Sequence, residues 1–270
     1  MDFLYNTVLG RILLCFMQKS GILKLAAAWL ESDKSCWYID RFIKKNNVDM
    51  RDFENQRFKS FAEFFARKKE LQIEKTDDNV LISPCDSLLS VYHISENRTF
   101  CVKDSLYRFE DLVPEPEMAE QFKDGLCMIF RLEARDYHHF CYVDDGVDSE
   151  AKFIPGLLHS VQPVALEQKP VFRQNRRYYH LFSSNNFGPV MQIEVGAVLV
   201  GDVHHCIKEG PVCKGEEAGY FRLCGSTIIL MFDKNFRNRF SFKEDIEDML
   251  EFMGEYPLSI GERLGTVNRS

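Results

Sequence analysis

The sequence changes character near residue 80, and this change constrains the fold more than any other feature. From about Leu81 onward, short apolar runs alternate with turn residues, as in "VLISP", "LCMIFRL", "YYHLFSS" and "TIILMF". Short runs that are rich in β-branched and aromatic residues, and bounded by glycine, proline or polar residues, predict strands. Residues 76–270 are therefore expected to form one β-rich body.

The first 75 residues show a helical period instead. Apolar residues recur at helical spacing over residues 3–17 and 22–30, and "SFAEFFARKKEL" continues this pattern. Short helices are also expected at 117–123 and 243–253. The predicted fold class is α+β, with a helical N-terminal arm (residues 1–75) followed by a β-rich body of short, tightly turned strands.

The arm begins with a broad apolar face, and two interpretations of this face stay open. The face either packs on the β body or lies in a membrane interface. Arg11 and Lys19 interrupt any continuous apolar span, and the start lacks the basic region and small-residue cleavage site of a secretory signal. The face consists of Phe3, Leu4, Val8, Leu9, Ile12, Leu13, Phe16 and Met17.

Charge and cysteine content narrow the function classes. The formal net charge of -7 argues against a nucleic-acid-binding surface, which needs clustered lysine and arginine. The nine cysteines include no CxxC pair, so we expect mostly reduced thiols in an intracellular protein. Glycines crowd the last third in "VGAVLVG", "KGEEAGYF" and "SIGERLG", a pattern of closely packed short strands that is also typical of lipoyl-type carrier domains.

Three stretches concentrate reactive side chains. "SPCDSLL" contains Asp86, "RDYHHFCYVDDG" contains His138, and "RLCGST" contains Ser226. Each residue alone is typical of a turn or a half-buried polar position, but together they supply the acid, base and hydroxyl of an activated serine. A metal is not expected, because neighbouring residues of a strand point to opposite faces and "GDVHHCIK" leaves only His204 and Cys206 on one side.

These motifs, in their order, resemble the phosphatidylserine decarboxylase family. The resemblance extends from "SFAEFFARK" through "LISPCDSLLSV", "FRLEARDYHHFCYVDDG", "FGPVMQIEVGAVLVGDV" and "GEEAGYFRLCGSTIILMF" to "SIGERLG". The family's LGST cleavage motif corresponds here to Cys224-Gly225-Ser226-Thr227, with Leu223 displaced by one position.

The resemblance implies a proenzyme that cuts itself between Gly225 and Ser226. The serine hydroxyl attacks the glycine carbonyl, the resulting ester is eliminated, and hydrolysis of the dehydroalanine leaves a pyruvoyl group. The implied products are a β chain (1–225) and an α chain (226–270). The matching catalytic residues are Asp86, His138 and Ser226, and residues 76–270 are then the catalytic domain.

The resemblance also implies the reaction and its setting. The pyruvoyl group made from Ser226 forms a Schiff base with phosphatidylserine, carbon dioxide leaves, and phosphatidylethanolamine is released without an external cofactor. The expected location is peripheral, on the cytoplasmic face of the cell membrane. Whether the chain forms a homodimer is left open.

The sequence departs from the common family pattern at four places. Many members have Asp-Tyr-His-Arg-x-His, whereas His139 replaces the arginine here and Cys141 replaces the second histidine. His139 and Cys141 are therefore candidate accessory residues. The usual glycine after the catalytic aspartate is Ser87, and the usual Asn-Glu-Arg triplet is Asn175-Arg176-Arg177.

Two alternatives compete with the decarboxylase interpretation. One is a β-rich carrier or lipid-surface binding module that keeps the glycine scaffold but does not cut itself. The other is a zinc-dependent hydrolase built from His138, His204 and Cys206.

Overall fold

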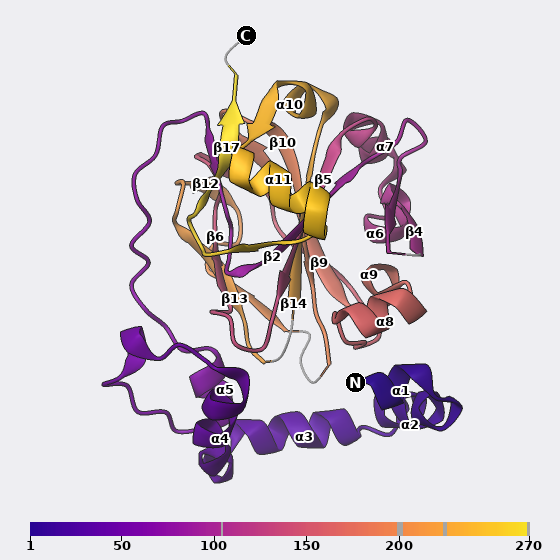
Figure 1. The fold of residues 1–270 in the computed structure, drawn as a ribbon, viewed down its shortest axis with the longest axis vertical. Coiled ribbons are helices and arrows are strands. Elements are labelled where there is room, and N and C mark those ends of the chain that lie inside the picture. The colour runs from indigo at the N-terminus through magenta and orange to yellow at the C-terminus, as the bar shows by residue number, and fades with distance from the viewer. Residues whose placement is uncertain (104, 199–201, 224–225, 269–270) are drawn as a thin grey trace.

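The computed structural model describes residues 1–103, 105–198, 202–223 and 226–268 of the chain. Within these residues, helices gather in the N-terminal arm and around an antiparallel β body (Figure 1). The predicted α+β class is confirmed. Cys224 and Gly225 of the predicted cleavage motif lie outside the described residues, so the structural account of that motif begins at Ser226.

The β body is built on a nine-stranded antiparallel sheet. Its strand order is β12-β7-β9-β10-β14-β5-β2-β16, and β8 pairs with β9 beside this path. The strands are β2 (Ser87–His93), β5 (Leu126–Leu132), β7 (Gly146–Asp148), β8 (Lys152–Ile154), β9 (Arg177–Ser184), β10 (Gly188–Val195), β12 (Gly210–Val212), β14 (Ser226–Phe232) and β16 (Tyr256–Leu258).

Strand β14 is buried on both faces of the sheet. Each of its seven residues is buried, because β10 and β5 cover its two edges and apolar clusters cover both faces. Alternate side chains of a strand point to opposite faces. Ile228 and Leu230 therefore join one core cluster, whereas Ile229 and Met231 join the other. The continuous apolar run "TIILMF" thus forms a fully buried central strand, as expected for a strand without a solvent face.

Three smaller sheets complete the strands. Their orders are β1-β17-β15, β11-β13-β6 and β3-β4. Gly219 of β13 shows why this part of the chain needs glycine, since a Cβ atom there would lie 2.3 Å from the carbonyl oxygen of His204. The strands are β1 (Val80–Ile82), β3 (Thr99–Val102), β4 (Ser105–Arg108), β6 (His139–Cys141), β11 (Val203–His205), β13 (Glu217–Phe221), β15 (Phe240–Phe242) and β17 (Arg263–Val267).

The arm is helical, as predicted, but its first helix is divided. The predicted helix over residues 3–17 is wrong as a single element, because Thr7 is extended (φ -115°, ψ 150°) and its hydroxyl accepts a hydrogen bond from Gly10 N. A threonine in this role starts a new helix. The arm elements are α1 (Asp2–Asn6), α2 (Val8–Lys19), α3 (Ile22–Glu31), η1 (Asp33–Ser35), α4 (Trp37–Asn46), η2 (Arg51–Phe53) and α5 (Phe61–Phe65).

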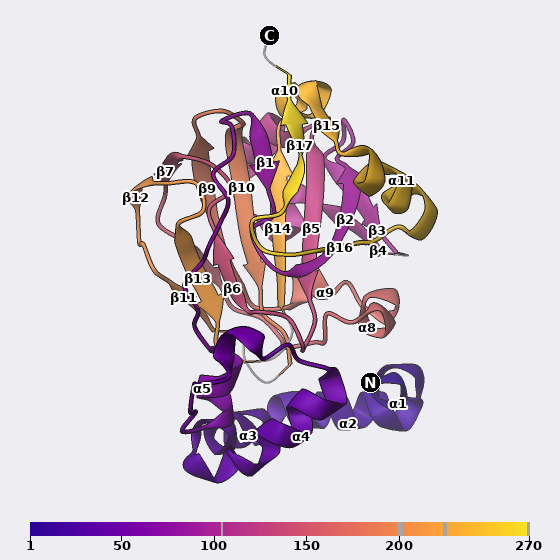
Figure 2. The ribbon, with the colours of Figure 1, turned by 60° about the vertical axis from the view of Figure 1, so that its left-hand side comes forward.

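The arm lies beneath one end of the β body and contacts it at both of its ends (Figures 1 and 2). Near its start, Tyr5 is fully buried, and its hydroxyl oxygen accepts a hydrogen bond from Ser160 N at 2.8 Å. Near its end, Phe61, Phe64 and Phe65 share a buried cluster with Leu223 of the β body. From α5 the chain then runs beside the body up to β1.

Most of the predicted apolar face of the arm is exposed. Leu9 is 67% exposed and Ile12 is 62% exposed, whereas Gly10 and Leu14 face inward. Among the described residues, no single helix is long and apolar enough to span a membrane; α2 and α3 satisfy length and composition only together, with a 67° bend between them. Packing on the body therefore does not account for this face.

The remaining helices lie on the β body. The predicted helix at 117–123 is confirmed as α7 followed by the 3₁₀ turn η3, and the helix at 243–253 is confirmed as α11. These elements are α6 (Phe109–Leu112), α7 (Pro116–Ala119), η3 (Glu120–Phe122), α8 (Pro163–Gln168), α9 (Val171–Gln174), α10 (Lys234–Arg239) and α11 (Glu244–Met253).

Candidate active site

Ser226 is the first residue of the central strand β14. Its backbone pairs with Leu132 of β5, and its side chain is fully buried. The Ser226 hydroxyl has no hydrogen-bond partner in the part of the chain that the structure describes. A buried hydroxyl without a partner is costly, because it loses its bonds to water and gains none in return. Such an atom is therefore a candidate for a chemical role rather than a structural one.

His138 is a buried, neutral imidazole. Its Nδ1 lies 2.9 Å from the carbonyl oxygen of Asp136, and because a carbonyl only accepts, Nδ1 carries the proton and Nε2 carries the free lone pair. Burial lowers the pKa of His138 to about 3. The Nε2 atom is buried and has no hydrogen-bond partner among the described residues. His138 can therefore accept a proton at Nε2.

The surroundings of His138 connect it to the segment before Ser226. Its carbonyl oxygen accepts a hydrogen bond from Phe221 N at 2.9 Å, where β13 runs beside β6. Its ring lies 4.1 Å from the ring of Phe65, centroid to centroid, and Phe65 shares a cluster with Leu223. His138 thus belongs to the same end of the β body as the start of β14.

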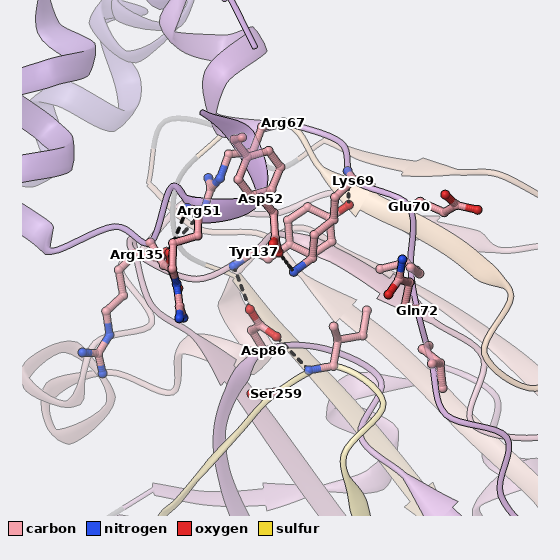
Figure 3. A pocket seen from close by; sticks show the side chains of 15 residues that line it. Arg51, Asp52, Arg67, Lys69, Glu70, Gln72, Asp86, Arg135, Tyr137 and Ser259 are labelled. Carbon is pink, nitrogen blue, oxygen red and sulfur yellow. Dashed lines mark hydrogen bonds and ion pairs between the residues drawn. The ribbon is translucent and has the colours of Figure 1, made fainter. Parts of the chain in front are cut away.

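The Asp86 carboxylate contacts the main chain next to His138 and is not the hydrogen-bond partner of the imidazole Nδ1. Its Oδ2 accepts a hydrogen bond from Tyr137 N at 3.3 Å, and its Oδ1 accepts one from Ile260 N at 2.7 Å (Figure 3). The partner of His138 Nδ1 is the Asp136 carbonyl. Asp86 therefore contacts Tyr137, the residue before His138. The imidazole itself is oriented by a backbone oxygen, the Asp136 carbonyl.

His139 is held on all sides. Its Nδ1 lies 2.7 Å from Glu217 Oε1 and its Nε2 lies 3.2 Å from the Ala66 carbonyl oxygen. Its ring stacks between those of Tyr137 and Tyr220, with centroid distances of 4.6 and 4.8 Å. Because both ring nitrogens have hydrogen-bond partners and both ring faces are covered, His139 stabilises the site and is poorly placed to transfer a proton.

Cys141 is buried as a neutral thiol. Its Sγ donates to the Ser83 carbonyl oxygen at 3.8 Å, and burial raises the pKa of the thiol to about 12. A thiol with such a pKa supplies almost no thiolate near neutral pH. Of the three residues that could replace the second histidine of the family pattern, only His138 offers a free acceptor atom.

The altered Asn-Arg-Arg triplet has a structural role. Asn175 Nδ2 donates to the carbonyl oxygens of His159 and Gly196, at 2.8 and 2.7 Å. Arg177 is buried, and among the described residues it donates only to carbonyl oxygens, including those of Leu112 and Asp111. The triplet therefore fixes the chain around Gly196, directly after β10. The Ser87 hydroxyl makes a weak local contact, to the Cys85 carbonyl oxygen at 3.4 Å.

A polar cavity of about 560 Å³ opens between the arm and the β body beside Asp86 (Figure 3). Arg67 and Lys69 line it together with Tyr137. Arg67 is buried: its guanidinium lies over the rings of Phe53 and Phe64 and donates to the Asp136 carbonyl oxygen at 3.3 Å. Sequence reasoning missed Arg67, because the run Arg67–Lys69 has the composition of an ordinary solvated surface.

A second, smaller cavity lies beside the end of β5. It measures about 180 Å³ and is lined by Leu132, the strand partner of Ser226, and by Val161 and Ala197. Its walls are mainly apolar, and Arg131 and Glu133 also line it. Residues 131–134 line the apolar cavity, and Arg135 and Tyr137 line the polar cavity beside Asp86.

The residues of the zinc hydrolase alternative do not form a metal-binding group. The ring of His204 lies against that of Tyr220 at a tilt of 38°, with a centroid distance of 4.9 Å, and Cys206 is exposed. His138 contacts Asp136, Phe65 and Phe221. Within the described ranges, the one group of three close metal-ligating side chains consists of other residues, His180, Glu194 and His205.

Comparisons with known proteins define the class to which this fold and site belong. The family model described as phosphatidylserine decarboxylase matches residues 58–265. Phosphatidylserine decarboxylase proenzyme 2 of Clostridium acetobutylicum is 38% identical over 99% of this chain and 92% of its own length. The phosphatidylserine decarboxylase proenzymes of Clostridium novyi and Clostridium perfringens are 35% and 36% identical over 98% and 97% of this chain. The chain belongs to the phosphatidylserine decarboxylase family, which confirms the resemblance found in its sequence.

Proposed function

We propose that this chain cuts itself between Gly225 and Ser226 and then decarboxylates phosphatidylserine to phosphatidylethanolamine. The observation that carries the proposal is the buried Ser226 hydroxyl, which has no hydrogen-bond partner among the described residues. It occupies the serine position of the family's cleavage motif, in a chain that belongs to the family. A hydroxyl that is buried at the start of a strand and has no hydrogen-bond partner among the described residues is suited to attack the adjacent carbonyl.

The cleavage needs a base and a leaving group, and the chain supplies both. His138 Nε2 takes the Ser226 hydroxyl proton and Oγ bonds to the Gly225 carbonyl carbon. The peptide C–N bond then breaks as the proton passes from His138 to the leaving nitrogen, which leaves an ester and a free amine. Loss of the Ser226 Cα proton then expels the ester as the carboxylate of Gly225. Water converts the remaining enamine, through its imine, into a pyruvoyl group and ammonia.

A base with a pKa of about 3 is weak, and this agrees with a reaction that happens once in each molecule. His138 is neutral at any pH near 7, so its lone pair is always present. Forming imidazolium in a buried site is unfavourable, which makes the proton transfer slow. A slow step is acceptable in maturation, whereas it would limit every cycle of turnover.

The pyruvoyl group, once formed at residue 226, supplies the electron sink that decarboxylation of an amino acid headgroup requires. The residues around it determine access and orientation. Leu132 and Ala197 give the neighbouring cavity aliphatic walls that suit the glycerol and acyl portion of a lipid. Arg131 also lines this cavity and is paired with Glu255 at 3.0 Å and with Glu133 at 3.5 Å, so two carboxylates balance its charge.

We also propose that the arm holds the enzyme on the membrane that contains its substrate. The exposed apolar side chains of α2 form a surface that water solvates poorly, and Arg11, Lys19 and Lys24 around it are exposed cations. An apolar face with a basic rim favours an interface rich in anionic lipid. The cytoplasmic face is the expected side, because the cysteine pattern is that of a protein kept reduced.

A denaturing gel and intact mass spectrometry test the main proposal. The wild-type chain should separate into fragments 1–225 and 226–270, and the second should resist amino-terminal sequencing because a pyruvoyl group has no amine. Ser226→Ala should stay intact and release no carbon dioxide from phosphatidylserine. Ser90→Ala on β2 is the matched control, since this serine is also buried in the large sheet but lies outside the cleavage motif. It should be cut as the wild type is.

Two results would refute the proposal. A folded wild-type chain that stays full length would favour the carrier or lipid-binding alternative. Cleavage of Ser226→Ala at the same bond would show that another nucleophile or an added protease does the work.

A further inference from the structure

Away from the candidate active site, two imidazoles and two carboxylates meet in the interior of the β body. His180 on β9 and Glu194 on β10 are buried, and His205 on β11 is partly exposed. One ligand atom from each of these three residues lies within 4.8 Å of those of the other two. Strands β9 and β10 are hydrogen-bonded neighbours, and β11 belongs to a separate small sheet beside them (Figure 2).

From this geometry we infer that His180, Glu194 and His205 form a binding site for a divalent transition metal ion, with zinc as the best match. Two imidazole nitrogens and one carboxylate oxygen form a common zinc ligand set, which leaves a fourth position for water. His180 Nε2 lies 2.8 Å from Glu194 Oε1, and His205 Nε2 lies 3.5 Å from Glu194 Oε2. Small side-chain shifts would let one ion contact all three residues.

Two of the ligand atoms lack hydrogen bonds. Glu194 Oε2 and His205 Nε2 are buried, and neither has a hydrogen-bond partner in the residues that the structure describes. Their 3.5 Å contact is an ion-pair distance without hydrogen-bond geometry. Glu194 as a whole is fully buried. A buried carboxylate oxygen that no donor satisfies is unfavourable, and a cation between Oε2 and Nε2 would satisfy both atoms.

The outer contacts orient the ligands as metal sites require. Asp148 Oδ1 accepts from His180 Nδ1 at 2.6 Å, so the Nε2 atom of His180 is directed at Glu194. Tyr142 donates to the other oxygen of Asp148 at 2.8 Å, and Gln192 donates to Glu194 Oε1 at 2.7 Å. A carboxylate on the far nitrogen of a ligating histidine fixes the tautomer and the ring angle. The partly exposed His205 gives an ion a route inward.

Protonation of His180 competes with metal binding at this site. Without a metal, burial lowers the pKa of His180, but the Glu194 and Asp148 carboxylates outweigh burial and raise this pKa to about 10. A proton on His180 then takes the place of the ion. The sequence predicted no metal, and its zinc alternative used His138, His204 and Cys206; His180 and Glu194 were not candidates, because they are separated along the chain from the histidine pair.

Metal analysis of the purified full-length chain tests the inference. After treatment with a chelator and dialysis against micromolar zinc, the wild type should retain about one zinc per chain by elemental mass spectrometry. His205→Ala and Glu194→Gln should bind at least about a hundredfold more weakly, since each loses a ligand. His204→Ala is the matched control, because this neighbouring histidine faces Tyr220, and it should bind as the wild type does. Circular dichroism would confirm that each variant is folded.

Cobalt(II) provides a second measurement that identifies the ligand atoms. Cobalt in this site should give weak visible bands without the intense near-ultraviolet charge-transfer band of a cobalt–thiolate bond. A thiolate band would place the ion on a cysteine, and equal zinc binding by wild type and His205→Ala would show that His205 is no ligand; either result would overturn the inference. Absence of stoichiometric zinc and cobalt from the folded wild type would also overturn it and leave His180 as a buried imidazolium.

Discussion

The neutral state of His138 predicts an acid sensitivity that can be measured without any enzyme assay. The folded chain holds the pKa of His138 at about 3, whereas the group titrates at 6.5 when it is exposed in the unfolded chain. Between these two pKa values, His138 is protonated in the unfolded chain and neutral in the folded chain. Stability from this group is therefore fully present above 6.5 and is lost as the pH falls toward 3.

The magnitude follows from the difference in proton binding. Between about pH 8 and about pH 5, the proton taken up by the unfolded chain lowers the free energy of unfolding by about 2 kcal/mol. His159, whose pKa burial lowers to about 4, adds a loss of the same sign, and Asp136, whose pKa burial raises to about 6, acts in the opposite direction. Both groups remain in a variant that lacks only the imidazole, so a comparison isolates His138.

Urea unfolding of two uncut chains provides the assay. Ser226→Ala keeps the chain in one piece, and the double variant Ser226→Ala with His138→Gln removes the titrating ring but keeps a side chain that can donate to the Asp136 carbonyl. From about pH 8 to about pH 5, the single variant should lose about 2 kcal/mol more stability than the double variant. Equal losses in the two proteins would show that His138 titrates normally, and the imidazole would then not be the buried neutral base proposed here.

Two further predictions concern the arm and the cysteine. Leu9→Asp with Ile12→Asp should weaken binding to phosphatidylserine vesicles at least about tenfold in sedimentation assays, because two large apolar side chains no longer leave water. The control, Phe252→Asp with Met253→Asp on α11, changes two exposed apolar side chains outside the arm and should bind normally. Equal binding by both double variants would contradict the membrane role of the arm. Cys141→Ser should be cut at the wild-type rate on a denaturing gel, because a thiol with a pKa of about 12 is no base, and loss of cleavage in a folded variant would show otherwise.

Much of the fold was predictable because its signals are local. The run "TIILMF" has the length and β-branched content of a buried strand, and it became the central strand of the large sheet. The division of the first helix was also within reach, since Thr7 is a good N-cap residue before an apolar run. The apolar period extends across Thr7, so the period alone predicts one continuous helix.

The features that sequence reasoning missed depend on contacts between distant segments. Arg67 is buried because the rings of Phe53 and Phe64 and the Asp136 carbonyl surround it, and no spacing in the run Arg67–Lys69 encodes that environment. The same holds for His180, Glu194 and His205, which come from three strands and meet only after the sheets form. Residue types indicate which groups can do chemistry, but strand register decides which of them meet.

The aromatic cluster of the arm adds a physical link that neither segment reveals alone. Phe65 packs against the ring of His138 at 4.1 Å, and the cluster that contains Phe65 also contains Leu223. The arm therefore supplies part of the apolar wall whose burial keeps His138 neutral, and it packs on the residue that lies three positions before Ser226. Because that burial is the first cause of the low pKa, any change that separates the arm from the body would hydrate the imidazole and raise its pKa toward the exposed value. The arm is thus part of the electrostatic environment of the site as well as the proposed contact with the membrane.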